Sequence, residues 1–203
     1  GNYKMVAIAA ATDKPSEDNK VSIKSKTEVV FPKNVVTDMF YTYQDIAVKD
    51  REESQNYDCI LKRGVTVLQL DSRSEIRPDY IKSFKCTITG NCGNVFDPST
   101  GHCHQPATMT KTYDISGDRF KAKRFTFSIY FFLGADNVSD ITLTTQSTDT
   151  AEKVVKSLSF KNVHMVKGKM TIYKGPFLST HSSASFIIDS PTIPDSGFST
   201  EFE

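Results

Sequence analysis

The sequence predicts an all-β protein built as an antiparallel β-sandwich, and three observations support this. Apolar and polar residues alternate with a period of two along most of the chain, as in strands with one face on a core and the other in water. Short polar turns such as "PSTG" and "KGK" separate these segments. No long amphipathic segment is present to cover a parallel sheet, as an α/β fold requires. We therefore expect antiparallel sheets packed face to face.

The expected strands follow from this alternation in chain order. In "YIKSFKCTITG", Phe84, Cys86 and Ile88 alternate with Lys and Thr, so one face is expected in the core. In "KAKRFTFSIYFFLGA", Tyr130 and Phe132 make the second face apolar too, which predicts a central strand. "DITLTTQSTD" alternates in the same way. The other strands are expected at residues 3–11, 20–31, 43–49, 57–70, 108–115, 154–165, 168–174 and 184–189.

The domain organisation is predicted from length and local composition. A chain of 203 residues can form one good core, or one complete domain with part of a second. The charged stretch "KDREESQNY" favours a boundary near Arg51, between an N-terminal β module at 1–50, whole or partial, and a β-sandwich at 51–203. A single merged sandwich is the alternative. Gly1 precedes an immediate strand, which suggests a trimmed or mature chain.

Composition and motifs argue against several classes of function. The 25 basic and 24 acidic residues nearly cancel, so no strong field attracts nucleic acid or an anionic membrane. No apolar run approaches the roughly 20 residues of a transmembrane helix. The sequence contains no phosphate-binding glycine loop, nucleophile elbow or His-Glu-x-x-His motif. We therefore expect neither an enzyme nor a cofactor.

The densest group of reactive side chains lies in "KCTITGNCGNVFDPSTGHCHQP". Its cysteines lack the close Cys-x2-Cys pairs of structural zinc sites, and no base is evident for a nucleophilic thiol, although both interpretations stay open. "FDPSTG" predicts a tight reversal, which favours a Cys92–Cys103 disulfide worth about 3 kcal/mol in an oxidising compartment, with reduced thiols as the alternative. Cys86 and Cys59 are expected in the core, and a Cys59–Cys86 pair is a further alternative.

Several short segments resemble the fimbrillin-like family of Bacteroides-type anaerobes, which includes fimbrial anchor subunits. The most telling are "DMFY" at 38–41, "LKRGV" at 61–65 and "FDPSTG" at 96–101. The later "NVHMVKGKMTIYKG" is similar to a closing strand pair of that family, with a departure from its usual pattern. The resemblance implies transthyretin-like sandwich domains in a secreted lipoprotein of type V pili. The family's lipidated cysteine matches no residue of this chain, so any lipid anchor lies outside it.

The resemblance also implies a function. It predicts a non-enzymatic structural or adhesive component, or anchor, of a fimbria at the cell surface and outer membrane. Its partners would be other subunits, joined by β-strand addition, and host or bacterial surface ligands. An extracellular carbohydrate-binding module and an accessory domain of a secreted hydrolase are the alternatives. The segment from about 190 is expected to be a loose tail or, in a pilus, a donor strand that presents Ile193, Phe198 and Phe202.

Overall fold

The protein is described here by a computed structural model. The model describes residues 1–11, 20–32, 35–49, 55–73, 75–117, 124–178 and 186–189. None of these residues lies in an α-helix, and strands dominate throughout. No helix long and apolar enough to cross a membrane occurs within these ranges. The prediction of an all-β, antiparallel sandwich is therefore confirmed.

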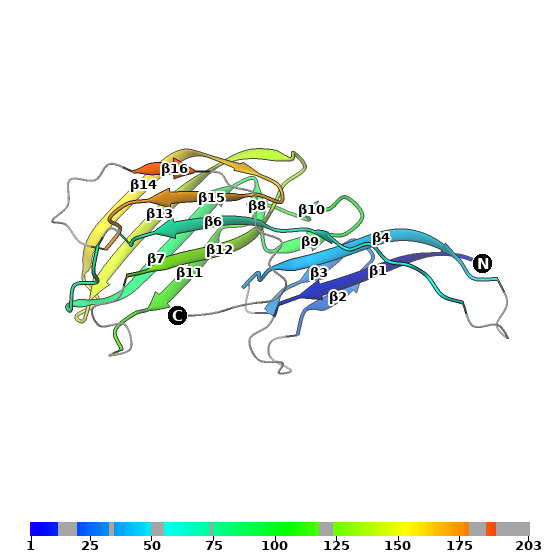
Figure 1. The fold of residues 1–203 in the computed structure, drawn as a ribbon, viewed down its shortest axis with the longest axis horizontal. Helices are drawn as coiled ribbons and strands as arrows, with labels where there is room; N and C mark the ends of the chain where they lie inside the picture. Colours follow the sequence, from blue (N-terminus) through cyan, green and yellow to red (C-terminus); the bar gives the residue numbers. More distant parts are fainter. Residues whose placement is uncertain are drawn as a thin grey trace.

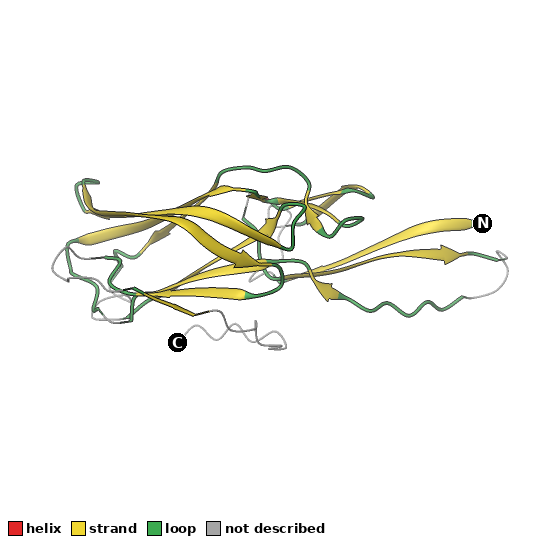
Figure 2. Ribbon diagram, turned by 90° about the horizontal axis from the view of Figure 1, so that it is seen from above, coloured by secondary structure: helices red, strands yellow, loops and turns green. Residues whose placement is uncertain are grey.

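Two sheets form the body of the molecule and appear as separate layers in Figure 2. The first contains, in spatial order, β11 (Met109–Asp114), β7 (Ile81–Gly90), β13 (Val138–Asp149) and β14 (Val154–Val166). The second contains β16 (Ile187–Asp189), β15 (Met170–Lys174), β6 (Thr66–Asp71), β12 (Thr126–Leu133) and β8 (Cys92–Gly93). Neighbouring strands are antiparallel, except that β15 pairs with β6 in parallel.

Two smaller sheets involve the N-terminal part of the chain. One contains β10 (His102–Cys103), β9 (Val95–Asp97), β3 (Glu28–Val30) and β2 (Ser22–Ser25). The other contains β1 (Asn2–Ala10), β4 (Met39–Ala47) and β5 (Lys62–Arg63). Strands β1 and β4 extend away from the body toward the N-terminus (Figure 1). We call β1, β4 and residues 55–61, which run back along β4, the ribbon.

The core consists largely of stacked and edge-to-face aromatic rings. Phe84 of β7 lies with its ring centroid 4.3 Å from that of Phe127 in the opposite sheet. At the other end of the body, Phe132 contacts Phe31 at 5.6 Å and Phe96 at 4.8 Å. All five side chains are almost completely buried and belong to one continuous cluster. This alternation of buried rings is what the period of two predicted for β7 and β12.

The structure bears on two further predictions about the fold. Strand β12 has β6 on one side and β8 on the other, as expected of a central strand. The predicted boundary at Arg51 falls outside the described residues. Strand β3 nevertheless pairs with β9, and Val29 shares a hydrophobic cluster with residues beyond 51. The division at residue 50 stays a prediction, with strands from both sides of it joined in one sheet.

Candidate functional site

The free edges of the sheets are the surfaces on which another chain can add a strand. An edge strand presents unpaired N–H and C=O groups, and proteins usually protect such edges with charges, bulges or short strands. Three edges are of interest here: those of β1, β14 and β16. These three edge strands differ in length, charge and regularity.

Strand β1 has a long and regular edge. All nine of its residues pair in register with β4, from Asn2 opposite Ala47 to Ala10 opposite Met39, and its other side has no partner among the described strands. Its only charge is Lys4, whose Nζ lies 2.5 Å from Asp45. That hydrogen bond raises the pKa of Lys4, so the ammonium stays charged and engaged with β4. The rest of the strand, "MVAIAA", carries no charge and no bulge to repel an added strand.

Strand β14 has a longer edge that is protected. Between Phe160 and Val163 its pairing with β13 shifts by one residue, and Asn162 adopts a left-handed φ of 55° in this bulge. Bulges twist an edge away from flat pairing. Lys156 Nζ reaches Pro176 O at 2.7 Å, and burial lowers the pKa of this lysine. Lys161 adds a further charge at the bulge itself. An incoming strand would meet these features along β14.

Strand β16 offers only a short edge. Its three residues pair with β15, and Lys174 of β15 lies 3.4 Å from Asp189. Ile187 and Ile188 are 63% and 60% exposed. The predicted donor residues Ile193, Phe198 and Phe202, which follow this strand in sequence, lie outside the described residues. Their role as a donor strand stays a prediction.

The third strand position of the ribbon is filled irregularly. Residues 55–61 run beside β4, where Tyr57 donates a hydrogen bond to Ala47 O at 2.7 Å and Gln44 donates to Asp58 O at 3.2 Å. Cys59 Sγ lies 3.9 Å from Met5 Sδ of β1. Cys59 is exposed, so the prediction that it lies in the core is wrong. The ribbon has no opposing sheet there to bury it.

The cysteines in the reversal lie close together without being joined. The tight turn is confirmed, since β9 and β10 pair and Gly101 N donates to Asp97 O at 2.7 Å. Cys92 and Cys103 are both free thiols, so the predicted bridge is not formed in this structure. Cys103 Sγ donates instead to Gln105 O at 2.8 Å and points at Gly93, beside Cys92.

Burial decides the chemistry of these thiols. It raises the pKa of Cys92 to about 12 and also raises that of Cys103, so both are protonated and weak nucleophiles at neutral pH. Pairing between them under oxidising conditions stays a prediction, which a peptide digest without reduction would test by mass spectrometry. Cys86 is buried in β7, as predicted. Cys59 and Cys86 are both free thiols, so a Cys59–Cys86 pair is not formed in this structure.

The four histidines of the chain, His102, His104, His164 and His181, were the other candidate ligands or bases. Within the described ranges, no three His, Cys, Asp or Glu side chains are placed to hold one metal ion. His164 lies 3.2 Å from Asp140 on the exposed pairing of β13 with β14. His181 lies outside the described residues.

Comparisons with known proteins give distant structural likenesses. No protein-family model matches the chain, and no curated protein matches it by sequence. One similar solved structure is a candidate adhesin of Bacteroides ovatus, with a TM-score of 0.48 and 12% identity, covering 79% of this chain and 65% of that one. Another is a candidate cell adhesion protein of Bacteroides uniformis, with a TM-score of 0.45 and 12% identity, covering 93% of this chain and 72% of that one.

These structural likenesses are limited in coverage and in sequence identity. The chain spans less than two thirds of the Bacteroides ovatus structure. At 12% identity and TM-scores below 0.5, they carry no argument about function here.

Proposed function

We propose that the protein is a non-enzymatic subunit of a cell-surface fimbria, structural or adhesive, that binds a neighbouring subunit along the free edge of β1. The observation that carries this proposal is the contrast between the edges. β1 is long, paired without a register shift and uncharged beyond Lys4, whereas β14 carries a bulge and lysines. A neighbouring strand would gain a main-chain hydrogen-bond ladder along β1, with side chains packing on the ribbon faces.

The side chains of the ribbon suit such an addition. Alternation along β1 places Tyr3, Met5 and Ala7 on one face, and this face is uncharged. Met5 and Ala7 are only half-buried and Tyr3 is exposed, because no second sheet packs on this part of the ribbon. The side chains of an added strand would pack beside this face and remove part of its apolar surface from water, at about 25 cal/mol per Å². The fimbrillin-like resemblance supplies the partner class, namely other subunits at the outer surface of a cell.

A carbohydrate-binding role is the second candidate, and one observation favours it. Tyr3 and Tyr57, at the far part of the ribbon, are 57% and 38% exposed. Exposed tyrosine rings can stack on sugar faces while their hydroxyls stay in water. A glycan array with the Tyr3→Ala variant would test this role. A broad hydrolase screen would test the remaining alternative of an enzyme-associated domain.

The proposed function is tested by placing a charge on the β1 edge. We expect Ala7→Lys to abolish incorporation of the protein into surface fibres, because a lysine on an edge strand opposes pairing. Ser157→Lys, on the protected β14 edge, is the matched control and should assemble normally. Circular dichroism and urea unfolding establish that both variants fold. Normal assembly of a folded Ala7→Lys variant would contradict the proposed role of β1.

The tail is tested separately. Deletion of residues 191–203 should block polymerisation if Ile193, Phe198 and Phe202 form a donor strand, while leaving the fold intact. Unchanged assembly would leave the tail without a donor role. Because β1 and the tail would act as acceptor and donor, the two experiments distinguish the two halves of one subunit contact.

A further inference from the structure

Three segments that are distant in sequence meet where the ribbon joins the body. Tyr41 of β4 lies directly opposite Lys62 of β5 in the strand pairing. The ring of Tyr41 packs edge-on against Phe96 of β9, with centroids 4.6 Å apart. Gly101, at the end of the turn between β9 and β10, lies against the hydroxyl of the same tyrosine. The segments "DMFY", "LKRGV" and "FDPSTG" therefore converge on Tyr41.

A fourth segment brings a lysine to the same point. A Cβ atom on Gly101 would overlap the Tyr41 hydroxyl and would lie only 2.8 Å from Lys167 Nζ, in the turn between β14 and β15. Gly101 also has a φ of 75°, which other residues rarely adopt. The glycine thus leaves room for a hydroxyl and an ammonium group above one stretch of backbone. We call Tyr41, Lys62, Gly101 and Lys167 the junction site.

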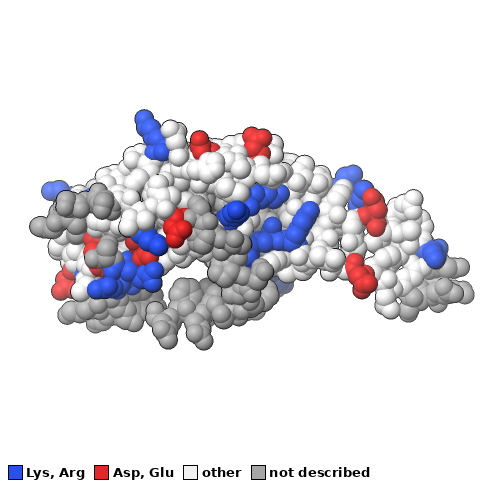
Figure 3. All heavy atoms as spheres, turned by 45° about the horizontal axis from the view of Figure 1, so that its top comes forward, with Lys and Arg blue, Asp and Glu red and all other residues white. Residues whose placement is uncertain are grey.

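The junction site holds two positive charges close together. Lys62 Nζ lies over the Tyr41 ring, 5.0 Å from its centroid. Burial and the charge of Lys62 both lower the pKa of Lys167. Neither lysine forms an ion pair with any residue that the structure describes. Figure 3 shows that several basic side chains gather near the middle of the face that it presents, and that acidic side chains occur elsewhere on the same face.

Two acidic residues lie near these lysines without forming an ion pair with them in the described part of the chain. His102, next to Gly101, has its pKa lowered by burial and by Lys167, so its ring is neutral near pH 7. Its Nδ1 is buried and has no hydrogen-bond partner within the described part of the chain. Asp97 is the acidic residue of the turn, and its carboxylate is oriented toward Ser99, from whose N and Oγ it accepts hydrogen bonds at 2.8 and 2.6 Å. Asp136 acts on His102 only through its charge.

Tyr41 supplies a hydroxyl at the same point. Its side chain is 2% exposed, and the hydroxyl packs on Gly101 beside Lys167. The buried atom of this region that lacks a hydrogen-bond partner among the described residues is His102 Nδ1, next to Gly101, whereas most buried polar groups have a partner. A ligand that accepts hydrogen bonds at this point would contact the hydroxyl and the lysines together.

We propose that the junction site binds an oxyanion, namely a sulfate or carboxylate group. The ammonium groups of Lys62 and Lys167 would supply charge, and the Tyr41 hydroxyl would donate a directed hydrogen bond. Charge-assisted bonds of this kind are stronger than neutral ones, and partial burial of Lys167 limits screening by salt. The proposal concerns a small ligand and is independent of strand addition at β1. The acceptor group could belong to a free anion or to an acidic sugar, and the two sources share this chemistry.

The test uses sodium sulfate, sodium acetate and glucose 6-sulfate as probes, at constant ionic strength adjusted with sodium chloride. Amide chemical shifts of the full chain are followed by NMR. We expect saturable shifts at Gly101 and His102 with the anions. Tighter binding of glucose 6-sulfate than of free sulfate would point to a sugar as the source, and equal binding to the free anion.

Three variants make the assignment specific. Lys167→Met should weaken anion binding about tenfold, equivalent to about 1.4 kcal/mol. Tyr41→Phe keeps the ring that packs on Phe96 and removes only the hydroxyl, so it should weaken binding several-fold without unfolding the protein. Lys85→Met, an exposed lysine of β7 away from the junction, is the control and should bind normally. Absence of saturable shifts in the wild type would overturn the proposal. So would binding by Tyr41→Phe and Lys167→Met that is as tight as binding by the wild type.

Discussion

The body and the ribbon handle apolar side chains in opposite ways. In the body, two sheets face each other, and residues such as Phe84 and Leu68 are completely buried between them. In the outer part of the ribbon, β1 and β4 have no second sheet over them, so Met5 and Ile46 are only half-buried and Tyr3 is 57% exposed. The inner end of β4 differs, since Met39 and Tyr41 are buried with the core of the body. The same alternating pattern thus gives a closed core in one region and an open apolar surface in the other.

This difference shows where stability and where binding reside. A sandwich of two sheets removes enough apolar surface from water to fold by itself, whereas a thin extended sheet does not. The ribbon is therefore held by its hydrogen-bond ladder and by the junction with the body. Its unburied side chains are available to a partner, in keeping with the role proposed for β1. Four predictions sharpen this contrast, beginning with the largest expected effect.

The thiols should show the largest difference between the regions. Cys59 lies exposed on the ribbon, whereas Cys86 is 1% exposed in the body and burial strongly raises its pKa. Only thiolates react readily, so we expect iodoacetamide at pH 8 to modify Cys59 at least about 100-fold faster than Cys86. Timed digestion and mass spectrometry give both rates. Equal rates would mean that the body opens easily and would remove the contrast.

Truncation of aromatic and apolar side chains should separate the regions next. Phe84→Ala removes a ring that contacts Phe127 at 4.3 Å and Phe177 at 6.1 Å, so we expect a loss of about 3–5 kcal/mol in the free energy of unfolding. Met5→Ala on the ribbon should cost less than about 1 kcal/mol in the free energy of unfolding, because the Met5 side chain is only half-buried and little buried apolar surface is removed. Urea unfolding measures both. A cost for Met5→Ala near that of Phe84→Ala would show that the ribbon is packed like the core.

The sequence predicted the body better than the ribbon for a physical reason. Buried strands such as β7 must alternate because a core lies on one side, so Phe84, Cys86 and Ile88 could be placed from sequence. Residues 57–61 contain an apolar run that resembled the start of a core strand. In the structure Ile60 is 86% exposed and the strand begins only at Lys62, because no sheet covers this run.

The junction site could not be found from the sequence. "FDPSTG" predicted the turn that contains Gly101, and this turn is confirmed. Tyr41 and Lys62 were recognised only as parts of short motifs, and Lys167 lies in the short polar turn "KGK" between two expected strands. Their approach depends on tertiary pairing of distant strands, which local alternation does not encode. A lysine in a turn becomes informative only when its neighbours in space are known.

Ion pairs should give a smaller effect than core truncation. Arg63 and Asp38 form two parallel hydrogen bonds of 3.0 and 3.1 Å where the ribbon joins the body, and the Arg63 side chain is only 10% exposed. Arg63→Ala should reduce the free energy of unfolding by about 2–3 kcal/mol, since it also removes packing on Phe40. The exposed Lys4 pair with Asp45 is the control, and Lys4→Ala should change nothing measurable. Similar losses in both variants would show that the Arg63–Asp38 pair contributes no more to stability than an exposed ion pair does.

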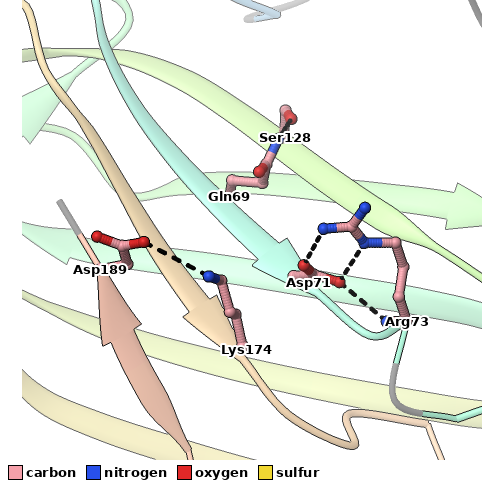
Figure 4. A network of polar contacts seen from close by, with 6 residues as sticks. All are labelled: Gln69, Asp71, Arg73, Ser128, Lys174 and Asp189. Atoms are coloured by element: carbon pink, nitrogen blue, oxygen red, sulfur yellow. Dashed lines mark hydrogen bonds and ion pairs between the residues drawn. The ribbon is translucent and has the colours of Figure 1, made fainter. Parts of the chain in front are cut away.

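The smallest expected effect is a pH-dependent one in the body, at the end of β6. Asp71 accepts hydrogen bonds from Arg73 Nε, Nη2 and backbone N at 2.9, 2.6 and 3.0 Å (Figure 4). These bonds, with a smaller contribution from Lys174, hold the pKa of Asp71 below its ordinary value. The lowered pKa means that the folded state favours the carboxylate more than the unfolded state does. Asp71 therefore stabilises the fold above about pH 4, and this contribution is lost as the pH falls through the folded pKa.

Replacement of the carboxylate tests this sign. Because Arg73 is largely exposed, we expect Asp71→Asn to lower the free energy of unfolding by only about 1 kcal/mol at pH 6. The difference from the wild type should shrink as unfolding is measured at pH 4, 3.5 and 3, since protonation then removes the same charge from the wild type. Asp189→Asn, which disrupts only the exposed pair with Lys174 in the same view, is the control and should give a smaller loss at pH 6. A difference between Asp71→Asn and the wild type that stays constant down to pH 3 would mean that the Asp71 charge contributes nothing and that only the shape of its hydrogen bonds matters.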